Sequence, residues 1–344
     1  MKEVRTVEDV AQFRIASDRQ LFAATHAEIE AGLTTDVYFV KTKQILTAMG
    51  HAQTEVVVEI FARRSGIVAG IPECLALLRK CNVGVRCLNE GDSFEPKDVI
   101  MQISGCYAEF GIYETAILGI LASSSGWATA AKEIKEAAAG RPVFCFGARH
   151  VHPAVAPVME RAAIVGGADG AACILGAKLA GLEPVGTVPH ALFLVVGDTV
   201  EAAKAYDAIM PPESPRTILV DTFKDEVEES LRVGDALGQA LQGVRLDTPG
   251  ERGGVTPGLV KELRAKLDLA GYNHVKIFAS GGLDVERIQL LAAAGVDAFG
   301  VGSYISAAKP IDMTMDIKVV AGKSVAKRGR IPGLTSGSKL VKKM

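Results

Sequence analysis

The chain has 344 residues, 49% of them hydrophobic and 23% charged, which supplies enough apolar surface for sizeable buried cores and excludes a disordered chain. Lys and Arg number 38 against 40 Asp and Glu, so the formal net charge of −2 gives no reason to expect a nucleic acid or a membrane as partner. The charged first residues do not resemble a signal peptide, and no apolar run approaches the length of a membrane span. Together with six scattered cysteines that form no C-x-x-C pair, these features predict a cytoplasmic protein with reduced thiols.

The first third of the chain has the pattern of a small α+β module. Residues 55–61 and 98–103 are short β-prone runs separated by turn-rich segments such as Asn89-Glu90-Gly91-Asp92. A helical stretch follows at about 108–139 and is interrupted by Gly119 and Gly126. We therefore expect a first domain at 1–125, together with a helix that links it to the next domain.

From about residue 142 the chain alternates strand, polar strand end and helix at the spacing of βα units, which predicts a parallel sheet or barrel. Continuously apolar runs, typical of strands buried on both faces, occur at 142–146, 184–187, 217–220, 244–246, 275–279 and 298–301. We expect this barrel domain at 126–330, and the helix between its last two strands is expected to be capped by Asp284 and Gly295. The basic segment 331–344, with its Gly and Ser residues, is expected to be a flexible tail.

The last two of these strands run directly into glycine-rich ends. Ser280-Gly281-Gly282 follows the strand at 275–279, and Gly302-Ser303 follows the strand at 298–301. Residues without a side chain let backbone N–H groups approach an anion, and the last two strand ends are the usual phosphate site of a (β/α) barrel. The sequence therefore predicts a site for a phosphorylated small molecule; tight turns alone are the alternative reason for these glycines.

Further candidate side chains lie at the carboxyl ends of the other strands. They are Phe146, Arg149, Thr187, His190, Asp221, Arg245 and Asp247. Because the carboxyl ends of barrel strands meet at one mouth, we expect these side chains to converge there. A single Asp at a strand end serves as a helix cap about as often as it serves in function, and Arg245 beside Asp247 could be a structural ion pair. Two acids with an Arg and a His at equivalent places favour a catalytic site.

Seven short segments form a recognisable set: TTDVYF at 34–39, FGARH at 146–150, GTVPH at 186–190, VDTF at 220–223, RLDT at 245–248, SGG at 280–282 and GVGS at 300–303. Together they resemble the type II phosphoribosyltransferases, and most closely the nicotinate phosphoribosyltransferases. They occur in the family's order, and the resemblance extends over about residues 34–330. It implies an N-terminal α/β sandwich domain, an incomplete (β/α) TIM-like barrel, and a homodimer or higher homo-oligomer whose active sites borrow residues across the interface.

The resemblance also implies a reaction of NAD biosynthesis or salvage, in which nicotinate and phosphoribosyl pyrophosphate give nicotinate mononucleotide and pyrophosphate. The residues expected to hold the 5′-phosphate are Ser280, Gly281, Gly282, Gly302 and Ser303. Asp221 and Asp247 would bind ribose hydroxyls or Mg²⁺ carried by the pyrophosphate, since hard cations take carboxylate oxygens. Arg245 would compensate charge on the pyrophosphate or on the nicotinate carboxylate.

On the pyridine side, the resemblance places the ring between Phe146 and Tyr38 of the partner subunit, with Arg149 facing the substrate's carboxylate and Thr187 among the binding residues. From the residues alone, Phe146 would be a core residue and Tyr38 a surface or interface residue. His150 stands where many family members have a second arginine, so another basic group would complete the recognition of the carboxylate.

His190 matches the histidine that the family phosphorylates when it couples turnover to ATP hydrolysis, so ATP use and a ligase-type classification are open. A lone histidine is more often a structural or substrate-binding group. The chain has no P-loop pattern, so ATP would have to use the phosphoribosyl pyrophosphate pocket.

Four other functions compete with this hypothesis. Quinolinate phosphoribosyltransferase shares the fold and needs more cations around the ring, for which Arg149, His150 and His152 are available. A nicotinamide phosphoribosyltransferase would leave those cations without a role. A sugar-phosphate lyase or isomerase would need a Schiff-base lysine or a carbonyl-polarising base at a strand end. The candidate lysine, Lys276, lies inside a predicted strand instead. A non-catalytic phosphate-binding protein would leave the acids at the strand ends without a task.

Overall fold

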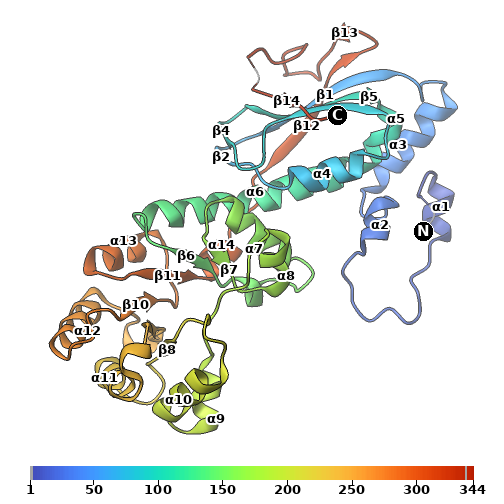
Figure 1. Ribbon diagram of the computed structural model, residues 1–344. Coiled ribbons are helices and arrows are strands. Elements are labelled where there is room, and N and C mark those ends of the chain that lie inside the picture. The colour runs from blue at the N-terminus through green and yellow to red at the C-terminus, as the bar shows by residue number, and fades with distance from the viewer. Residues whose placement is uncertain (1–2, 338) are drawn as a thin grey trace. The chain divides into compact units, whose positions relative to one another are not determined.

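The computed structural model describes residues 3–337 and 339–344, and it divides into two compact units. The first comprises Met1–Thr129 and Lys309–Met344, and the second comprises Ala130–Ala308. The chain passes from one to the other within the long helix α6 (Glu114–Ala137). An antiparallel α/β unit joined to a parallel strand-helix unit is the predicted fold class, which is confirmed (Figure 1).

The first unit is built on an antiparallel sheet of six strands in the order β13-β12-β1-β5-β3-β14. These strands are β1 (Glu55–Ala62), β3 (Val83–Cys87), β5 (Val99–Cys106), β12 (Met313–Val320), β13 (Lys323–Ser324) and β14 (Val341–Lys342); β2 (Gly66–Ile67) and β4 (Ser93–Phe94) form a separate pair. Its helices are α1 (Val7–Gln12), α2 (His26–Glu30), α3 (Val37–Ala48), α4 (Ile71–Leu78), α5 (Tyr107–Phe110) and the first part of α6. Apolar side chains that alternate along β1, such as Val58, Ile60 and Ala62, are fully buried in one continuous core.

The end of the chain differs from the expected division, in which 126–330 formed the barrel domain and 331–344 a flexible tail. Residues 309–344 belong to the first unit because β12 pairs with β1 and β14 pairs with β3. Leu340 is buried in the core of that unit, and the buried carboxylate of Glu59 accepts hydrogen bonds from the backbone N–H and the hydroxyl of Thr335. These contacts join residues far apart in the sequence, so local composition could not reveal them.

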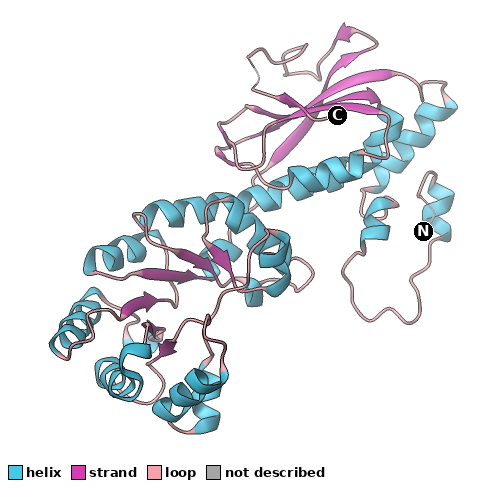
Figure 2. Cartoon of the chain, viewed as in Figure 1, coloured by secondary structure: helices cyan, strands magenta, loops and turns pink. Residues whose placement is uncertain are grey.

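The second unit is an incomplete barrel of parallel strands surrounded by helices (Figure 2). Six strands run in the order β7-β6-β11-β10-β9-β8: β6 (Val143–Cys145), β7 (Gly170–Ala171), β8 (Thr217–Leu219), β9 (Gly243–Leu246), β10 (Lys276–Ala279) and β11 (Ala298–Val301). The helices are α7 (Ala156–Val165), α8 (Ile174–Leu179), α9 (His190–Val196), α10 (Thr199–Ile209), α11 (Glu226–Leu237), α12 (Pro257–Leu269), α13 (Val285–Ala294) and α14 (Ser303–Ser306). As predicted, the side chain of Asp284 caps α13 and Gly295 ends it with a left-handed backbone.

One predicted strand is wrong. Residues 184–187 form no strand; their place beside the second barrel strand is marked by a single backbone hydrogen bond, from Val185 N to Ala171 O at 2.9 Å. Pro184 has no N–H to donate, and β7, which has only two small residues, gives a poor template for a longer ladder. The segment therefore enters the barrel mouth as a loop, between the edge strands β7 and β8.

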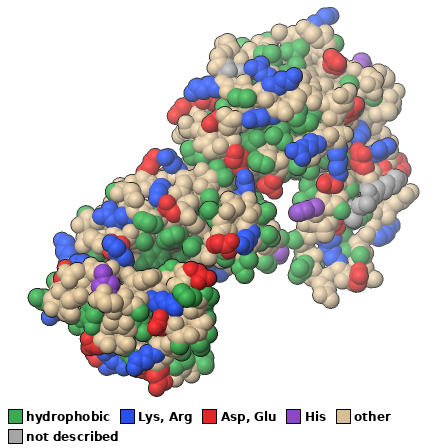
Figure 3. Space-filling view, in the orientation of Figure 1, with side chains coloured by type: hydrophobic (Ala, Val, Ile, Leu, Met, Phe, Trp, Pro, Cys, Tyr) green, Lys and Arg blue, Asp and Glu red, His purple; other side chains and the backbone are tan. Residues whose placement is uncertain are grey.

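On the face drawn in Figure 3, basic and acidic side chains are interspersed over both units. This agrees with the near balance of 38 basic and 40 acidic residues. Among the helices of the described residues, none combines the length and the apolar character needed to cross a bilayer. All six cysteines are free thiols.

Candidate active site

A cavity of about 500 Å³ lies at the carboxyl ends of the barrel strands. It brings together twelve of the residues expected there: Phe146, Arg149, His150, Thr187, His190, Arg245, Asp247, Ser280, Gly281, Gly282, Gly302 and Ser303. They come from loops after strands that are distant in sequence, and they meet because parallel strands end at the same edge. Two candidates do not line it. Asp221 lies behind His190, and Tyr38 belongs to α3 of the other unit.

A polar network connects the ends of β9 and β10. Arg245 donates from Nε to Ser280 Oγ at 2.9 Å and from Nη1 to Thr187 Oγ1 at 3.0 Å. Ser280 Oγ in turn donates to Asp247 Oδ1 at 2.6 Å, and Arg245 Nη2 lies 3.5 Å from that same oxygen. The alternative role expected for Arg245, a structural ion pair with Asp247, is therefore present. Its 3.5 Å distance is longer than the 2.6 Å hydrogen bond from Ser280 to the same carboxylate. Both side chains remain partly open to the cavity, at 16% and 24% exposure.

Phe146 presents an aromatic wall beside this network. The Arg245 guanidinium carbon lies 5.3 Å from the centroid of the Phe146 ring, within cation–π range. Phe278 meets Phe146 edge to face at a centroid distance of 6.0 Å. A Cβ at Gly300 would come within 2.5 Å of the Phe146 ring, so only glycine there lets the ring lie against the backbone of β11.

Arg149 and His150 differ in whether their side chains have a hydrogen-bond partner. Among the described residues, Arg149 has no hydrogen bond or ion pair, so its exposed guanidinium is free for an anionic ligand. The ring Nδ1 of His150 lies 3.1 Å from Ser306 Oγ, which orients the imidazole. The cavity therefore offers one wholly unpaired cation and one histidine held by a serine.

His190 and Asp221 form a hydrogen-bonded pair at the edge of the cavity. Nε2 of the imidazole lies 3.1 Å from Asp221 Oδ2, and the Asp221 side chain is only 2% exposed. Burial raises the pKa of Asp221, the contact with His190 lowers it, and nearby Asp247 raises it again, so the net shift is upward. The second oxygen, Oδ1, is buried without a hydrogen bond. Among the cavity-lining residues, Asp221 therefore meets His190, and it does not line the cavity itself.

The glycine-rich ends are not all equivalent. Gly281 and Gly282 have left-handed backbones, with φ of +88° and +60°, and a Cβ on Gly282 would enter open space. A Cβ on Gly302 would instead meet His150 Cε1 at 2.8 Å and the backbone oxygen of Phe146 at 2.9 Å. Gly282 therefore leaves room for a ligand, whereas Gly302 leaves room for the loop that carries His150.

Sequence reasoning missed Glu160, which also lines the cavity from α7. Its side chain is fully buried, and its two oxygens accept backbone hydrogen bonds from Ala148 N at 3.1 Å and Cys173 N at 2.6 Å. A signal was present in the sequence, since Ala156, Met159 and Ala163 define an apolar helix face on which Glu160 also lies. An acid on such a face is rarely buried without a partner.

Tyr38, expected to reach a neighbouring subunit, lies on α3 and is 54% exposed. Its hydroxyl donates to Asp36 Oδ2 at 3.1 Å, and Asp36 is also bonded to the hydroxyl of Thr115 at 3.0 Å. The ring is therefore held at the surface of the first unit.

The donors in the cavity suit a metal that arrives with its ligand better than a resident one. Within residues 3–337 and 339–344, no group of three or more His, Cys, Asp or Glu side chains is placed to hold a metal ion. Asp247 lines the cavity, and Asp221 has a buried oxygen without a partner. Two carboxylates are enough for Mg²⁺ only if other oxygens, such as those of a phosphate, complete its shell.

The fold and the cavity together define the class: an α/β protein whose incomplete parallel barrel carries a polar cavity at the carboxyl ends of its strands. Residues 36–125 match the quinolinate phosphoribosyl transferase N-terminal domain, and residues 127–316 match the C-terminal domain of the same family. The chain belongs to the quinolinate phosphoribosyl transferase family.

Three known proteins show the range of similarity. The crystal structure of nicotinate-nucleotide pyrophosphorylase from Pyrococcus furiosus is 46% identical with a TM-score of 0.88, covering 92% of this chain and 82% of that one. Nicotinate phosphoribosyltransferase pncB2 of Mycobacterium tuberculosis is 33% identical over 240 residues, 67% of this chain and 50% of the relative. Quinolinate phosphoribosyltransferase [decarboxylating] 2 of Nicotiana glauca is 22% identical over 275 residues, 78% of this chain and 75% of the relative. The chain thus spans about half the length of the mycobacterial relative.

Proposed function

We propose that this protein transfers the phosphoribosyl group of phosphoribosyl pyrophosphate to the ring nitrogen of a pyridine carboxylate, forming nicotinate mononucleotide and pyrophosphate for NAD biosynthesis. The observation that carries the proposal is the cavity at the strand ends, which combines an unpaired cation, an aromatic wall and a glycine-rich end with open space beside Gly282. Membership of the quinolinate phosphoribosyl transferase family supports the same reaction class.

The reaction asks the site to hold two substrates and to stabilise charge. As the bond from C1 of ribose to pyrophosphate breaks, positive charge develops on the sugar and negative charge on the leaving group. Ser280, Gly281 and Gly282 would receive the 5′-phosphate at the end of β10, beside the first turn of α13. Gly302 and Ser303 would complete that anion site at the end of β11. Fixing the ribose there brings C1 to the pyridine nitrogen.

The charged groups of the network would act on the other half of the substrate. Asp247 would bind a ribose hydroxyl or a cation, while Arg245, held by Ser280 and Thr187, would face the pyrophosphate. Asp247, which lines the cavity, would hold Mg²⁺ carried by the pyrophosphate, and Asp221, whose Oδ1 is buried without a partner, would join it only if His190 gave way. When bound there, the ion would neutralise charge on the leaving group.

Two pyridine acids compete as acceptor, and the comparisons weigh toward quinolinate. Both matched domains carry the quinolinate name, whereas the mycobacterial relative is a nicotinate phosphoribosyltransferase. Nicotinate is the second candidate, because Arg149 is the one cavity cation among the described residues without a partner, and nicotinate has one carboxylate. A quinolinate reaction must also release one carboxylate as CO₂ to balance the same product.

Coupling to ATP and assembly are further parts of the proposal. His190 is partly exposed at the cavity and oriented by Asp221, which suits a histidine that accepts a phosphoryl group. Tyr38 of the partner subunit would stack on the pyridine ring opposite Phe146 in a homodimer. The exposed position of Tyr38 in each subunit is compatible with that role.

The test is a substrate panel. Purified protein is given phosphoribosyl pyrophosphate and Mg²⁺ with quinolinate, nicotinate or nicotinamide, and pyrophosphate and CO₂ release are measured. Pyrophosphate with CO₂ identifies quinolinate as acceptor, and pyrophosphate without CO₂ identifies nicotinate. Release with nicotinamide alone, or with none of the three, would contradict a pyridine-carboxylate phosphoribosyltransferase. Labelled ATP added to the same assay would test phosphorylation of His190.

A further inference from the structure

Glu160 is a buried acid in a cavity suited to anions, which is an unfavourable place for a carboxylate unless it has a task. Its side chain is fully buried on α7, although it borders the cavity. A buried carboxylate is tolerated when hydrogen-bond donors surround it. The donors here are backbone N–H groups, contributed by two separate strand-end loops.

The first of these loops follows β6 and carries the cavity's pyridine-facing groups. Glu160 Oε1 accepts from the N–H of Ala148 at 3.1 Å. Ala148 opens the short 3-10 turn Ala148–His150, so the carboxylate caps the turn on which Arg149 and His150 lie. Helix and turn starts bind negative charge because their first N–H groups lack a partner within the turn.

The second loop follows β7 and leads into α8. Glu160 Oε2 accepts from the N–H of Cys173 at 2.6 Å, a short bond to the residue immediately before that helix. Gly176 of α8 lies against the same side chain, since a Cβ there would be 3.1 Å from Glu160 Cβ. A single carboxylate therefore connects the ends of two neighbouring barrel strands.

Packing beside Glu160 holds the first loop from a second side. A Cβ on Gly147 would lie 2.7 Å from Met159 Cε, so Met159 and Glu160, neighbours on α7, both contact the segment between Phe146 and Arg149. The end of β10, where the 5′-phosphate is proposed to bind, has a different support, the network of Arg245, Ser280 and Asp247.

We propose that Glu160 is a positioning residue for recognition of the pyridine carboxylate, acting through the backbone of the Phe146–His150 loop. This inference rests on the proposed transferase function. The carboxylate occupies the N–H groups at the ends of β6 and β7, so these do not compete for the substrate's anionic groups, and it fixes the direction in which Arg149 and His150 enter the cavity. Binding groups must be held within about 0.5 Å of their productive positions for full affinity and rate.

The requirement is for two acceptor oxygens, which distinguishes Glu160 from a space-filling side chain. In Glu160→Gln the shape is kept, but the amide nitrogen carries hydrogens and must face one of the two backbone N–H groups. One loop then loses its bond while the helix stays packed. Glu160→Asp keeps both oxygens on a side chain that is one methylene shorter.

The experiment compares these variants with Glu229→Gln, a matched control. Glu229 is also fully buried in the barrel unit, but it bonds to Arg232 and does not line the cavity. In Glu160→Gln we expect the KM for the pyridine acid to rise about tenfold to a hundredfold, because a misplacement of about 1 Å can cost on the order of a hundredfold. The KM for phosphoribosyl pyrophosphate should change by less than about threefold, because its anchor lies on β10 and β11. Glu160→Asp should fall between.

A structural readout accompanies the kinetics and does not depend on activity. Hydrogen exchange of peptides that contain Ala148 and Cys173 should speed up in Glu160→Gln and remain slow in Glu229→Gln. Equal increases of both KM values, or wild-type kinetics in a folded Glu160→Gln, would overturn the positioning role. If the wild type itself transfers to no pyridine acid, the proposed function fails, and unchanged exchange in Glu160→Gln would then separately refute the tethering.

Discussion

Each unit of the chain contains a cavity of similar volume, about 520 Å³ in the first unit and about 500 Å³ in the barrel. Both are lined by a mixture of basic and acidic side chains, so neither their size nor the presence of both charges separates them. The difference lies in the pairing of those charges. It decides which cavity can bind an anion.

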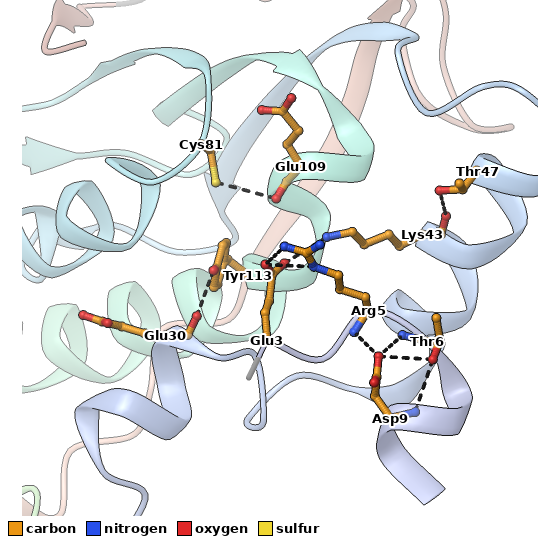
Figure 4. A network of polar contacts seen from close by, with 10 residues as sticks. All are labelled: Glu3, Arg5, Thr6, Asp9, Glu30, Lys43, Thr47, Cys81, Glu109 and Tyr113. Atoms are coloured by element: carbon orange, nitrogen blue, oxygen red, sulfur yellow. Dashed lines mark hydrogen bonds and ion pairs between the residues drawn. The ribbon is translucent and has the colours of Figure 1, made fainter. Parts of the chain in front are cut away.

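In the first unit the cations face glutamates from neighbouring segments (Figure 4). Glu3 lies between Lys43 Nζ, at 3.0 Å, and the guanidinium of Arg5, at 3.1 Å. Lys80 pairs with Glu30, whose backbone oxygen also accepts from the Tyr113 hydroxyl at 2.9 Å. These contacts join the start of the chain to α3, and α2 to the segment after α4, which is a structural task.

In the barrel cavity one cation is left free and another is aimed by neutral groups. Arg149 has no partner among the described residues, and Arg245 is held by two hydroxyls and an aromatic face as well as by Asp247. A cation that is already paired gains little from a ligand, whereas an unpaired one gains a charge-assisted hydrogen bond. The barrel cavity is therefore the candidate active site.

The largest effect is expected at Asp247. Asp247→Ala should lower kcat by on the order of a hundredfold or more, because it removes an electrostatic contact that strengthens as charge develops at C1. Asn should restore activity in part, since it keeps a hydrogen bond with Ser280 and loses the charge. Steady-state kinetics of Asp247→Ala are compared with those of Asp235→Ala. Asp235 is an exposed acid of α11 that bonds to Tyr272 and does not line the cavity. Full turnover with only a lower Tm would make Asp247 a structural partner of Arg245.

The next prediction sets one cation of each cavity against the other. Arg149→Ala should raise the KM for the pyridine acid by about tenfold to a hundredfold, the value of a hydrogen bond to a charged group. Lys43→Ala should leave both KM values unchanged and lower the free energy of unfolding by about 1 kcal/mol or less, as for other partly exposed ion pairs. Kinetics and urea unfolding on both variants check this. The reverse pattern would move the anion site to the first unit.

A third prediction concerns space rather than charge, and it uses two glycines that both have a positive φ. Gly282 and Gly295 both have positive φ, +60° and +106°, and a Cβ on either meets nothing within 4 Å. Alanine should destabilise the protein by about 1 kcal/mol at each position. Only Gly282→Ala places a methyl group in the proposed phosphate space, so only it should raise the KM for phosphoribosyl pyrophosphate, by about tenfold. Equal KM values in the two variants would remove the phosphate assignment.

How far the sequence could predict the fold and the site depends on whether a feature is set by neighbouring residues or by distant ones. The strands at 217–220, 244–246 and 298–301 were predictable because a continuous apolar run is a local property. Convergence of Arg149, His190 and Asp247 at one mouth followed from the rule for parallel strands. Pairing of β12 with β1 and of β14 with β3 depends on residues more than 200 positions apart, so the tail was assigned wrongly. The rule for parallel strands concerns residues at strand ends, so it does not predict a cavity residue such as Glu160, which lies on a helix.

The smallest predicted effect is a difference in pH dependence between acids of the two cavities. Burial raises the pKa of Glu3, but the opposing contacts with Lys43 and Arg5 outweigh it, so the pKa is lowered overall. The stabilisation by Glu3 is then present above the pKa of the unfolded chain and is lost as the pH falls through the folded value. Burial raises the pKa of Glu160 despite its backbone hydrogen bonds. Its contribution is present below the unfolded pKa and is lost as the pH rises through the folded value.

Urea unfolding of the wild type, Glu3→Gln and Glu160→Gln across mildly acidic pH would separate the two signs. The stability difference between wild type and Glu3→Gln should shrink as the pH falls, by less than about 1 kcal/mol because the pair is partly exposed. The difference between wild type and Glu160→Gln should shift in favour of the variant as the pH rises, since the glutamine has no charge to bury. Parallel curves for the two variants would mean that the charges of both cavities are equally compensated, and the distinction between a paired cavity and an open one would then rest on Arg149 alone.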